Sequence, residues 1–392
     1  MKLYFTFIYL FIALKVISQN VDFDKGSVSE KKYYEEVSFD LVFDKIIIPV
    51  TINNKTYRFL LDTGAPNVIS KKLFDELKTE KKNKVIVNDA NNIDQSLITT
   101  EISSLKIGAL TFTNQIAIVY DLANHNVLSC FGIDGFIGSN LLRNSILKIS
   151  SKENKIILTN TIKNINPQKK PTKIKLIGSQ KAPYIEFDFI GKNKVEVTDM
   201  VLIDTGMSGF YEMSNRAYKM FEEHHVFDVL GSNIGVTTIG LFGAGNPSEQ
   251  KLMQVETGIL NNSAIKNLIL TTVEDTNSRI GLDFLKYGDF ILDFNKENAY
   301  FEFADNVTLQ TKIPKYHATV IENKYVIGIV WDKNYAEKMS LGDEIIRIED
   351  HIINEMTFCQ ILELKTQIKD LKNYEIEIKN KENKNNIIQI EN

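Results

Sequence analysis

Two short stretches of this chain could do chemistry together, because each places Asp-Thr-Gly after an apolar run. The first is FLLDTGAPNVIS at 59–70 and the second is VLIDTGMSGF at 201–210. Two carboxylates about 3 Å apart cannot both ionise cheaply, so they share one proton and can act as acid and base together. One aspartate could take a proton from water while the other protonates a substrate carbonyl, without a covalent intermediate. Asp62 and Asp204 are therefore the candidate catalytic residues.

The sequence downstream of each triplet repeats as well. FIGSNLLRNSILKI at 136–149 matches RIGLDFLKYGDFILDF at 279–294. Ile-Gly follows the catalytic aspartate at almost the same distance, with its glycine 76 residues after Asp62 and 77 residues after Asp204. One Asp-Thr-Gly could arise by chance at average residue frequencies. Two copies with the same internal spacing indicate two similar lobes in one chain.

Strand patterns precede each triplet. The segments 46–64 and 184–206 contain β-branched runs around turn residues, which predict strand pairs that deliver Asp-Thr-Gly. NINPQKKPTK at 164–173 contains two prolines and three lysines and is typical of a linker. We therefore predict a first lobe at 39–163 and a second at 174–305.

LLDTGA at 60–65 together with FIGSNLL at 136–142 resembles the retropepsin family of aspartic peptidases. Retropepsins form the dyad from two identical subunits, whereas their pepsin-like relatives fuse two lobes in one chain. This sequence resembles a fused pair of retropepsin-like lobes over roughly residues 39–305. The resemblance implies a bilobal β-barrel fold and these site residues: catalytic Asp62 and Asp204, interlocking Thr63 and Thr205, close-approach Gly64 and Gly206, and Ile137, Gly138, Ile280 and Gly281 packing behind the catalytic loops.

The second copy departs from the family pattern at one position. Ala65 follows the first triplet as expected, but Met207 stands where a small residue is usual, which puts the symmetry of the dyad in doubt. The family also covers its cleft with hairpin flaps. Here 84–100 has apolar arms around a polar tip and 234–246 has a glycine-rich tip, so each is a candidate flap or an ordinary surface hairpin.

The C-terminal part differs in character. MSLGDEIIRIEDHIIN at 339–354 resembles the PDZ family, in which an apolar residue and Gly-Asp precede a strand and a tight turn. That family binds extended peptides at a sheet edge beside a helix, and 357–368 is amphipathic. The usual carboxylate-binding loop is missing, with 325–329 as the nearest candidate. We predict a PDZ-like α+β domain at 312–392 that either recruits peptides or packs on the peptidase.

The N-terminus predicts export. A charged start, a mostly apolar stretch from Leu3 to Ile17 and small residues before Gln19 are typical of a signal peptide at 1–18, followed by a linker at 19–38. The stretch is short and contains Lys15, so we expect no stable membrane span after cleavage; an uncleaved anchor is the alternative. The expected location is the periplasm, the cell envelope or the outside of the cell.

Composition narrows the possible classes of function. A formal net charge of −4 without a basic block argues against nucleic-acid binding. Two cysteines are too few for a disulfide-stapled scaffold, and we predict that Cys130 and Cys359 are buried free thiols. The adjacent His224 and His225 lack the spacing of a metal site.

The sequence thus predicts a mainly β, exported aspartic endopeptidase that acts on protein or peptide substrates and needs no metal or organic cofactor. A peptide ligand at the PDZ-like domain is a further expected partner. The main alternative is an inactive peptidase-like protein that binds peptides at the cell envelope. Another alternative pairs each lobe with its copy in a second chain.

Overall fold

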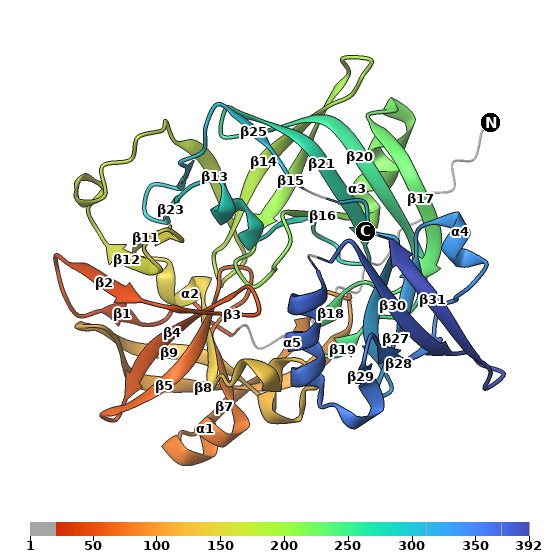
Figure 1. Cartoon of the computed structure of the whole chain (residues 1–392). Helices are drawn as coiled ribbons and strands as arrows, with labels where there is room; N and C mark the ends of the chain where they lie inside the picture. Colours follow the sequence, from red (N-terminus) through yellow and green to blue (C-terminus); the bar gives the residue numbers. More distant parts are fainter. Residues whose placement is uncertain (1–20, 311, 370, 392) are drawn as a thin grey trace, which may run out of the picture.

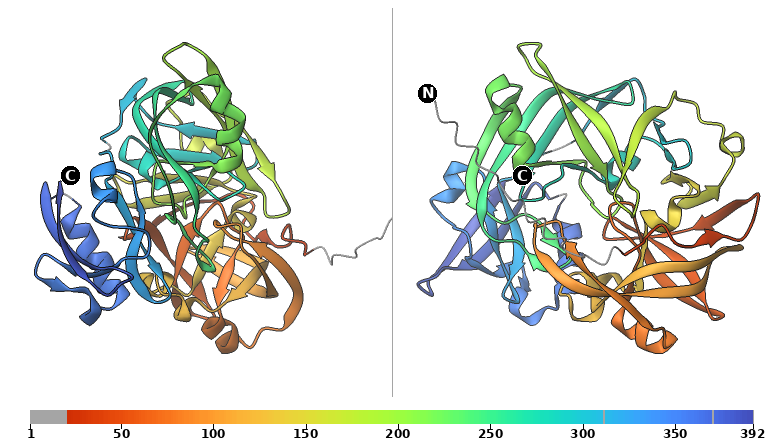
Figure 2. Two further views of the ribbon diagram at one scale, coloured as in Figure 1. Left: turned by 90° about the vertical axis from the view of Figure 1, so that its right-hand side faces the viewer. Right: turned by 180° about the vertical axis from the view of Figure 1, so that it is seen from behind.

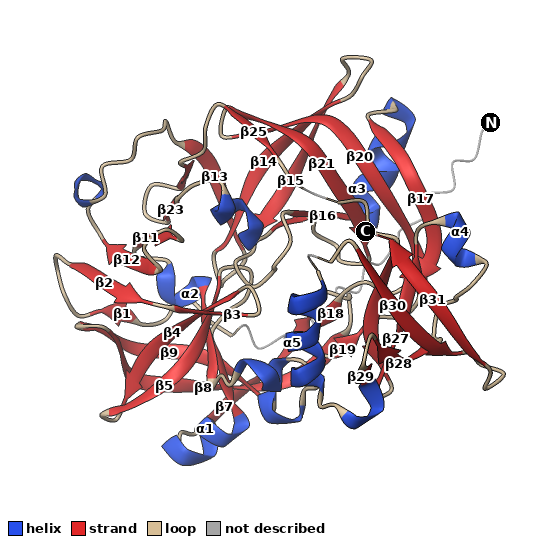
Figure 3. Cartoon of the chain, viewed as in Figure 1, coloured by secondary structure: helices blue, strands red, loops and turns tan. Residues whose placement is uncertain are grey.

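The computed structural model describes residues 21–310, 312–369 and 371–391, and the chain folds mainly into strands (Figure 1, Figure 3). The predicted mainly β fold class is confirmed. The predicted signal peptide at 1–18 lies outside the described residues. Within the described ranges, no helix has the length and apolar character needed to cross a membrane.

The first sheet closes into a barrel, because β8 pairs with both β4 and β9. Asn53 and Asn54 take positive φ in the turn between β4 and β5, as a tight hairpin requires. The strand pair predicted around turn residues in 46–64 is therefore confirmed. The strands of this first barrel are β1 (Ser27–Val28), β3 (Asp40–Val42), β4 (Lys45–Ile52), β5 (Lys55–Asp62), β6 (Val68–Ser70), β7 (Lys81–Asn88), β8 (Asp94–Ile107), β9 (Leu110–Tyr120) and β10 (Gly135–Gly138).

The second barrel repeats this plan, with β20 pairing both β21 and β14 to close it. Its strands are β14 (Ala182–Ile190), β15 (Glu196–Ile203), β16 (Tyr211–Ser214), β17 (Phe227–Gly235), β20 (Ser248–Leu260), β21 (Ser263–Val273), β22 (Arg279–Ile280) and β25 (Asn306–Thr308). A two-stranded hairpin, β18 (Ile239–Gly240) and β19 (Gly243–Ala244), is inserted between β17 and β20.

The strands of the second barrel belong to a 14-stranded sheet, and the remaining strands of that sheet connect the two barrels. They are β2 (Tyr34–Ser38), β11 (Ile146–Ser150), β12 (Lys155–Thr159), β13 (Thr172–Ile177), β23 (Phe290–Asp293) and β24 (Asn298–Phe301). A strand pair follows each Ile-Gly segment, β11–β12 in the first copy and β23–β24 in the second, and β11 pairs antiparallel with β23. The two copies of the repeat are thus joined by backbone hydrogen bonds.

The prediction of a linker at 19–38 is wrong for residues 21–38, the part of this segment that the structure describes. β1 pairs with β9 and β2 pairs with β12, and the side chains of Phe23 and Tyr33 are buried. The segment looks polar because most of its residues face solvent. The few apolar side chains still attach it to the sheets.

Short helices follow equivalent strands in the two barrels. α1 (Lys71–Leu77) and α3 (Asn215–Phe221) are each capped by a serine, Ser70 and Ser214, whose hydroxyl accepts a backbone N–H of the first turn. α2 (Ser139–Leu142) and a 3-10 helix at Leu282–Lys286 follow the Ile-Gly pairs. The internal repeat in the sequence is therefore a repeat of structure.

The C-terminal unit, residues 316–391, has its own sheet and its own apolar core. Its elements are β26 (Tyr316–Ile321), β27 (Lys324–Val330), α4 (Lys333–Ala336), β28 (Glu344–Ile348), β29 (His351–Ile352), α5 (Phe358–Ile368), β30 (Asn373–Lys379) and β31 (Asn385–Glu391). Drawn in blue, the unit packs against the side of both barrels (Figure 1, Figure 2). The Val236 N–H donates to the Gly328 carbonyl at 2.9 Å across this contact.

Candidate active site

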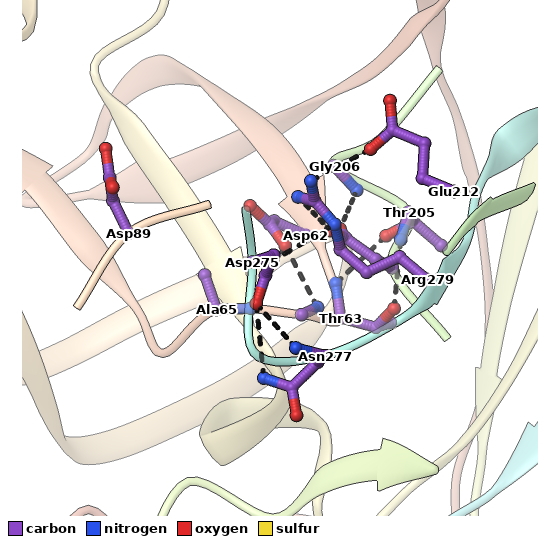
Figure 4. A network of polar contacts seen from close by, with 12 residues as sticks. Asp62, Thr63, Ala65, Asp89, Thr205, Gly206, Glu212, Asp275, Asn277 and Arg279 are labelled. Atoms are coloured by element: carbon purple, nitrogen blue, oxygen red, sulfur yellow. Dashed lines mark hydrogen bonds and ion pairs between the residues drawn. The ribbon is translucent and has the colours of Figure 1, made fainter. Parts of the chain in front are cut away.

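The two Asp-Thr-Gly triplets lie at equivalent turns of the two barrels. Asp62 ends β5, and Asp204 directly follows β15. Each of these strands pairs in parallel with the strand that carries Ile-Gly, so that Gly138 lies opposite Asp62 and Ile280 opposite Ile203. Parallel pairing at the same register carries both turns to the interface between the barrels (Figure 4).

The two threonines lock these turns together. The Thr63 hydroxyl donates to the Ile203 carbonyl at 2.6 Å, and the Thr205 hydroxyl donates to the Leu61 carbonyl at 2.8 Å. Each hydroxyl also accepts the backbone N–H of the other threonine, at 3.0 and 3.1 Å. Both side chains are fully buried. The interlocking arrangement is formed within one chain, so the structure does not support the alternative of a dyad shared between two chains.

The two glycines allow each carboxylate to approach the opposite turn. A Cβ on Gly64 would lie 2.7 Å from the Asp204 Cγ, and a Cβ on Gly206 would lie 2.5 Å from the Asp62 Oδ2. No side chain fits at such distances. Each aspartate therefore lies against the other triplet, as a shared-proton pair requires.

The Ile-Gly pairs pack behind the catalytic turns. Ile137 and Ile280 are buried. A Cβ on Gly138 would lie 2.3 Å from the Pro66 carbonyl carbon, and one on Gly281 would lie 2.5 Å from the Gly209 carbonyl oxygen. All ten residues predicted for the site are thus brought together around the two turns.

The hydrogen bonds to the two carboxylates differ. Asp62 Oδ1 accepts the N–H groups of Gly64 and Ala65, both at 3.0 Å. Asp204 Oδ1 accepts the N–H of Gly206 at 2.8 Å, whereas the N–H of Met207 donates to the backbone carbonyl of Asp204. The departure at Met207 therefore coincides with one amide fewer on the second carboxylate.

Arg279 supplies a cation next to Asp204, and Figure 4 shows Arg279 with Glu212 and Asp275 around it. Its buried guanidinium lies 3.5 Å from Asp204, 3.4 Å from Asp275 and 2.9 Å from Glu212. Burial disfavours its charge, but these three carboxylates hold the pKa of Arg279 above its ordinary value. Arg279 was not among the predicted site residues. The sequence does distinguish it, because Arg279 precedes Ile-Gly in the second copy where Phe136 precedes Ile-Gly in the first.

Lys45 is a second cation that the sequence analysis missed. Its Nζ donates to the Gly206 carbonyl oxygen, and burial lowers the pKa of this ammonium although Asp204 and Asp62 oppose the effect. Burial, followed by the charge of Asp204, raises the pKa of Asp62 to about 7. Asp62 therefore keeps its proton to a higher pH than an ordinary aspartate does, and Asp204 faces Arg279.

The dyad opens into a cavity of about 780 Å³, here called the central cavity. Both predicted flaps line it. The first is the β7–β8 hairpin, and the second is the β18–β19 hairpin, a smaller element than predicted because 234–246 also includes the end of β17. The Asp89 carboxylate accepts the Phe242 N–H at 2.9 Å, and the Asn91 side chain donates to the Gly243 carbonyl at 2.8 Å. The two flap tips therefore meet across the cavity.

The two cysteines form a disulfide, so the prediction of free thiols is wrong. Cys130 lies in a 3-10 helix at Leu128–Phe131 beside the central cavity, and Cys359 lies in the first turn of α5. Their 229-residue separation in sequence suggested unrelated environments. Docking of the C-terminal unit on the first barrel brings them together, an arrangement that no local pattern encodes.

A metal site is not formed by the described ranges, which contain no group of three or more His, Cys, Asp or Glu side chains placed to hold an ion. His125 instead hydrogen-bonds the Gly240 carbonyl through Nε2 at 3.0 Å, and its Nδ1 accepts backbone N–H groups. Its role in the structure is to support the loop beneath the flaps.

Comparison with known proteins agrees with this geometry for the first barrel. Residues 48–141 match a family model described as Aspartyl protease, a stretch that includes Asp62 and its Ile-Gly pair. This match supports a hydrolase of the aspartic-protease type. No curated protein matches the chain.

Several solved structures match part of this chain. A retropepsin-like aspartic protease from Rickettsia conorii is 19% identical, with a TM-score of 0.24 over 34% of this chain and 95% of that chain. The aspartic proteinase from Irpex lacteus is 13% identical, with a TM-score of 0.39 over 70% and 99%. Conglutin gamma, a basic 7S globulin from lupine seeds, is 11% identical, with a TM-score of 0.38 over 70% and 94%.

Proposed function

We propose that this chain is an exported aspartic endopeptidase that hydrolyses peptide bonds with water activated between Asp62 and Asp204. The observation that carries the proposal is the pair of interlocked turns, which puts both carboxylates against each other at the floor of one cavity. An extended peptide under the two flaps would present its carbonyl to the dyad.

The asymmetry of the dyad supports a role for each carboxylate. Asp204 faces Arg279 and would act as the base that takes a proton from water. Asp62, with a pKa raised to about 7 by burial and by the charge of Asp204, would donate its proton to the carbonyl oxygen. The resulting tetrahedral diol collapses when a proton reaches the leaving nitrogen. This assignment implies activity that falls as the pH rises through about 7.

Export is supported by the disulfide as well as by the N-terminal sequence. Disulfides persist mainly in oxidising compartments such as the periplasm or the outside of the cell. The Cys130–Cys359 bond joins the first barrel to the C-terminal unit, which favours a unit that packs on the peptidase over a separate peptide recruiter. Mass spectrometry of the exported protein, with and without reductant, tests both the cleavage after residue 18 and the bond.

A second candidate function is peptide binding without turnover. Arg279 and Lys45 both lie at the dyad, and two cations favour ionisation of both carboxylates, which would leave no proton to donate. The test is cleavage of a mixed peptide library from pH 3 to 8 by the protein without residues 1–18, beside D62N and D204N. Cleavage abolished by either substitution supports the endopeptidase. A folded but inert protein that still binds peptides supports the alternative.

A further inference from the structure

One face of α5 belongs to the central cavity. The cavity lining includes four positions with the spacing of a single helix stripe: Leu362, Lys365 and Thr366 on α5, and Lys369 at its C-cap. Ile361 and Leu364, on the neighbouring stripe, are buried in the core of the C-terminal unit. The cavity that contains the dyad is therefore walled on one side by the C-terminal unit.

This wall is held in place covalently. Cys359 in the first turn of α5 is bonded to Cys130, and the 3-10 helix around Cys130 contributes Leu128 and Phe131 to the same cavity. Thr357 caps α5 with a reciprocal capping box, which fixes the start of the helix. The cavity face of α5 thus has a defined position relative to the first barrel.

The two lysines on this face have no anionic partner among residues 21–310, 312–369 and 371–391. The Lys365 side chain is exposed to solvent and lines the cavity, where desolvation by the neighbouring protein lowers the pKa of its ammonium without any carboxylate to oppose the effect. Two acidic groups of the cavity already have partners: Asp275 pairs with Arg279, and Asp89 accepts backbone N–H groups. The charge without a partner at this wall is positive.

We propose that Lys365, with Lys369 one turn further along the cavity face, binds a carboxylate of the peptide substrate, so that the C-terminal unit sets the specificity of the peptidase. The inference rests on the proposed function, because it assumes that peptides occupy the cavity. A carboxylate inside the cavity would lie beside two ammonium groups, and water screens such a pair less in a cavity than on an open surface. A neutral or basic residue at the same place would leave Lys365 unpaired.

The test measures binding separately from cleavage. The probes are N-acetylated, C-amidated octapeptides that carry either Glu or Gln at each position in turn, and one series ends in a free carboxylate. Binding to D62N, which keeps the cavity but cannot cleave, is measured by titration calorimetry. We expect at least tenfold tighter binding of Glu than of Gln at one position. That preference should disappear in D62N/K365Q and persist in D62N/K333Q, because Lys333 on α4 is exposed and outside the cavity.

A variant that reverses the charge of residue 365 distinguishes a direct ionic contact with the peptide from a structural effect of the substitution. K365E should bind a Lys peptide better than the Glu peptide at the same position, with an unchanged melting temperature. In the active protein, K365Q should raise KM for the Glu peptide and leave its kcat unchanged.

The outcomes separate the proposals. Equal binding of Glu, Gln and free-carboxylate peptides, or no binding of any peptide, overturns the carboxylate subsite. A preference lost in K365Q and restricted to the free-carboxylate series supports the subsite and assigns it to the end of the peptide. Selective binding without any cleavage by the unmodified protein supports the subsite and refutes only the endopeptidase.

Discussion

Replacing Asp62 with Asn should stabilise the protein at high pH while it abolishes catalysis. Burial, together with the charge of Asp204, raises the pKa of Asp62 to about 7 from an ordinary 3.8. At about 1.36 kcal/mol for each pH unit, ionising Asp62 in the folded chain costs about 4 kcal/mol. The Asn side chain retains an oxygen that can accept the N–H groups of Gly64 and Ala65.

The sign of the pH dependence follows from proton binding. Between about pH 4 and 7 the folded chain holds a proton at Asp62 that the unfolded chain releases, so the contribution of this group is complete below 3.8 and is lost as the pH rises through about 7. Urea unfolding should give equal stabilities for the wild type and D62N at pH 4. At pH 8 D62N should be more stable by up to about 4 kcal/mol.

Asp204→Asn is the matched control. Asp204 faces Arg279 at 3.5 Å, so its removal takes a partner from a buried cation and should not stabilise the protein at any pH. The reasoning is refuted if D62N is no more stable than the wild type at pH 8, or if D204N is stabilised to the same extent.

Three further substitutions test other parts of the site. Thr63→Val should cost about 2–4 kcal/mol in urea unfolding, because it leaves the buried Ile203 carbonyl and a threonine N–H without partners, whereas Thr63→Ser should recover most of the loss. Arg279→Met should cost about 3–5 kcal/mol, because three carboxylates lose their cation; an unchanged urea midpoint contradicts the network. Cys359→Ser should lower stability by about 2–5 kcal/mol, and reductant should destabilise only the wild type; equal responses to reductant disprove the bond.

The site residues were predictable from the sequence where both copies of the repeat meet the same structural requirement. Asp62 and Asp204 were predictable because each needs a following glycine for the close approach of the other carboxylate, and the Ile-Gly pairs because they pack behind the same turns. The strand pairs were predictable from alternating apolar residues and from Asn53, whose left-handed backbone marks a turn.

The features that break the repeat were not predicted. Arg279 stands where the other copy has Phe136, and only the folded chain reveals which carboxylates surround it. Lys45 lies in an ordinary strand pattern and meets Gly206 through the interface between the barrels. The partner of Cys130 depends on how the C-terminal unit docks, which is a matter of tertiary packing.

The bond between Cys130 and Cys359 also encloses the whole second barrel in a covalent ring. The proposed peptidase activity would expose each molecule in concentrated solution to the active sites of other copies. The connection at 165–171 between the two barrels is a loop without helix or strand. A cut there would not separate the two fragments. The disulfide still links them covalently, and the backbone hydrogen bonds between β11 and β23 hold them together as well. Self-cleavage would leave the two carboxylates facing each other, and the nick would become visible only on a reducing gel.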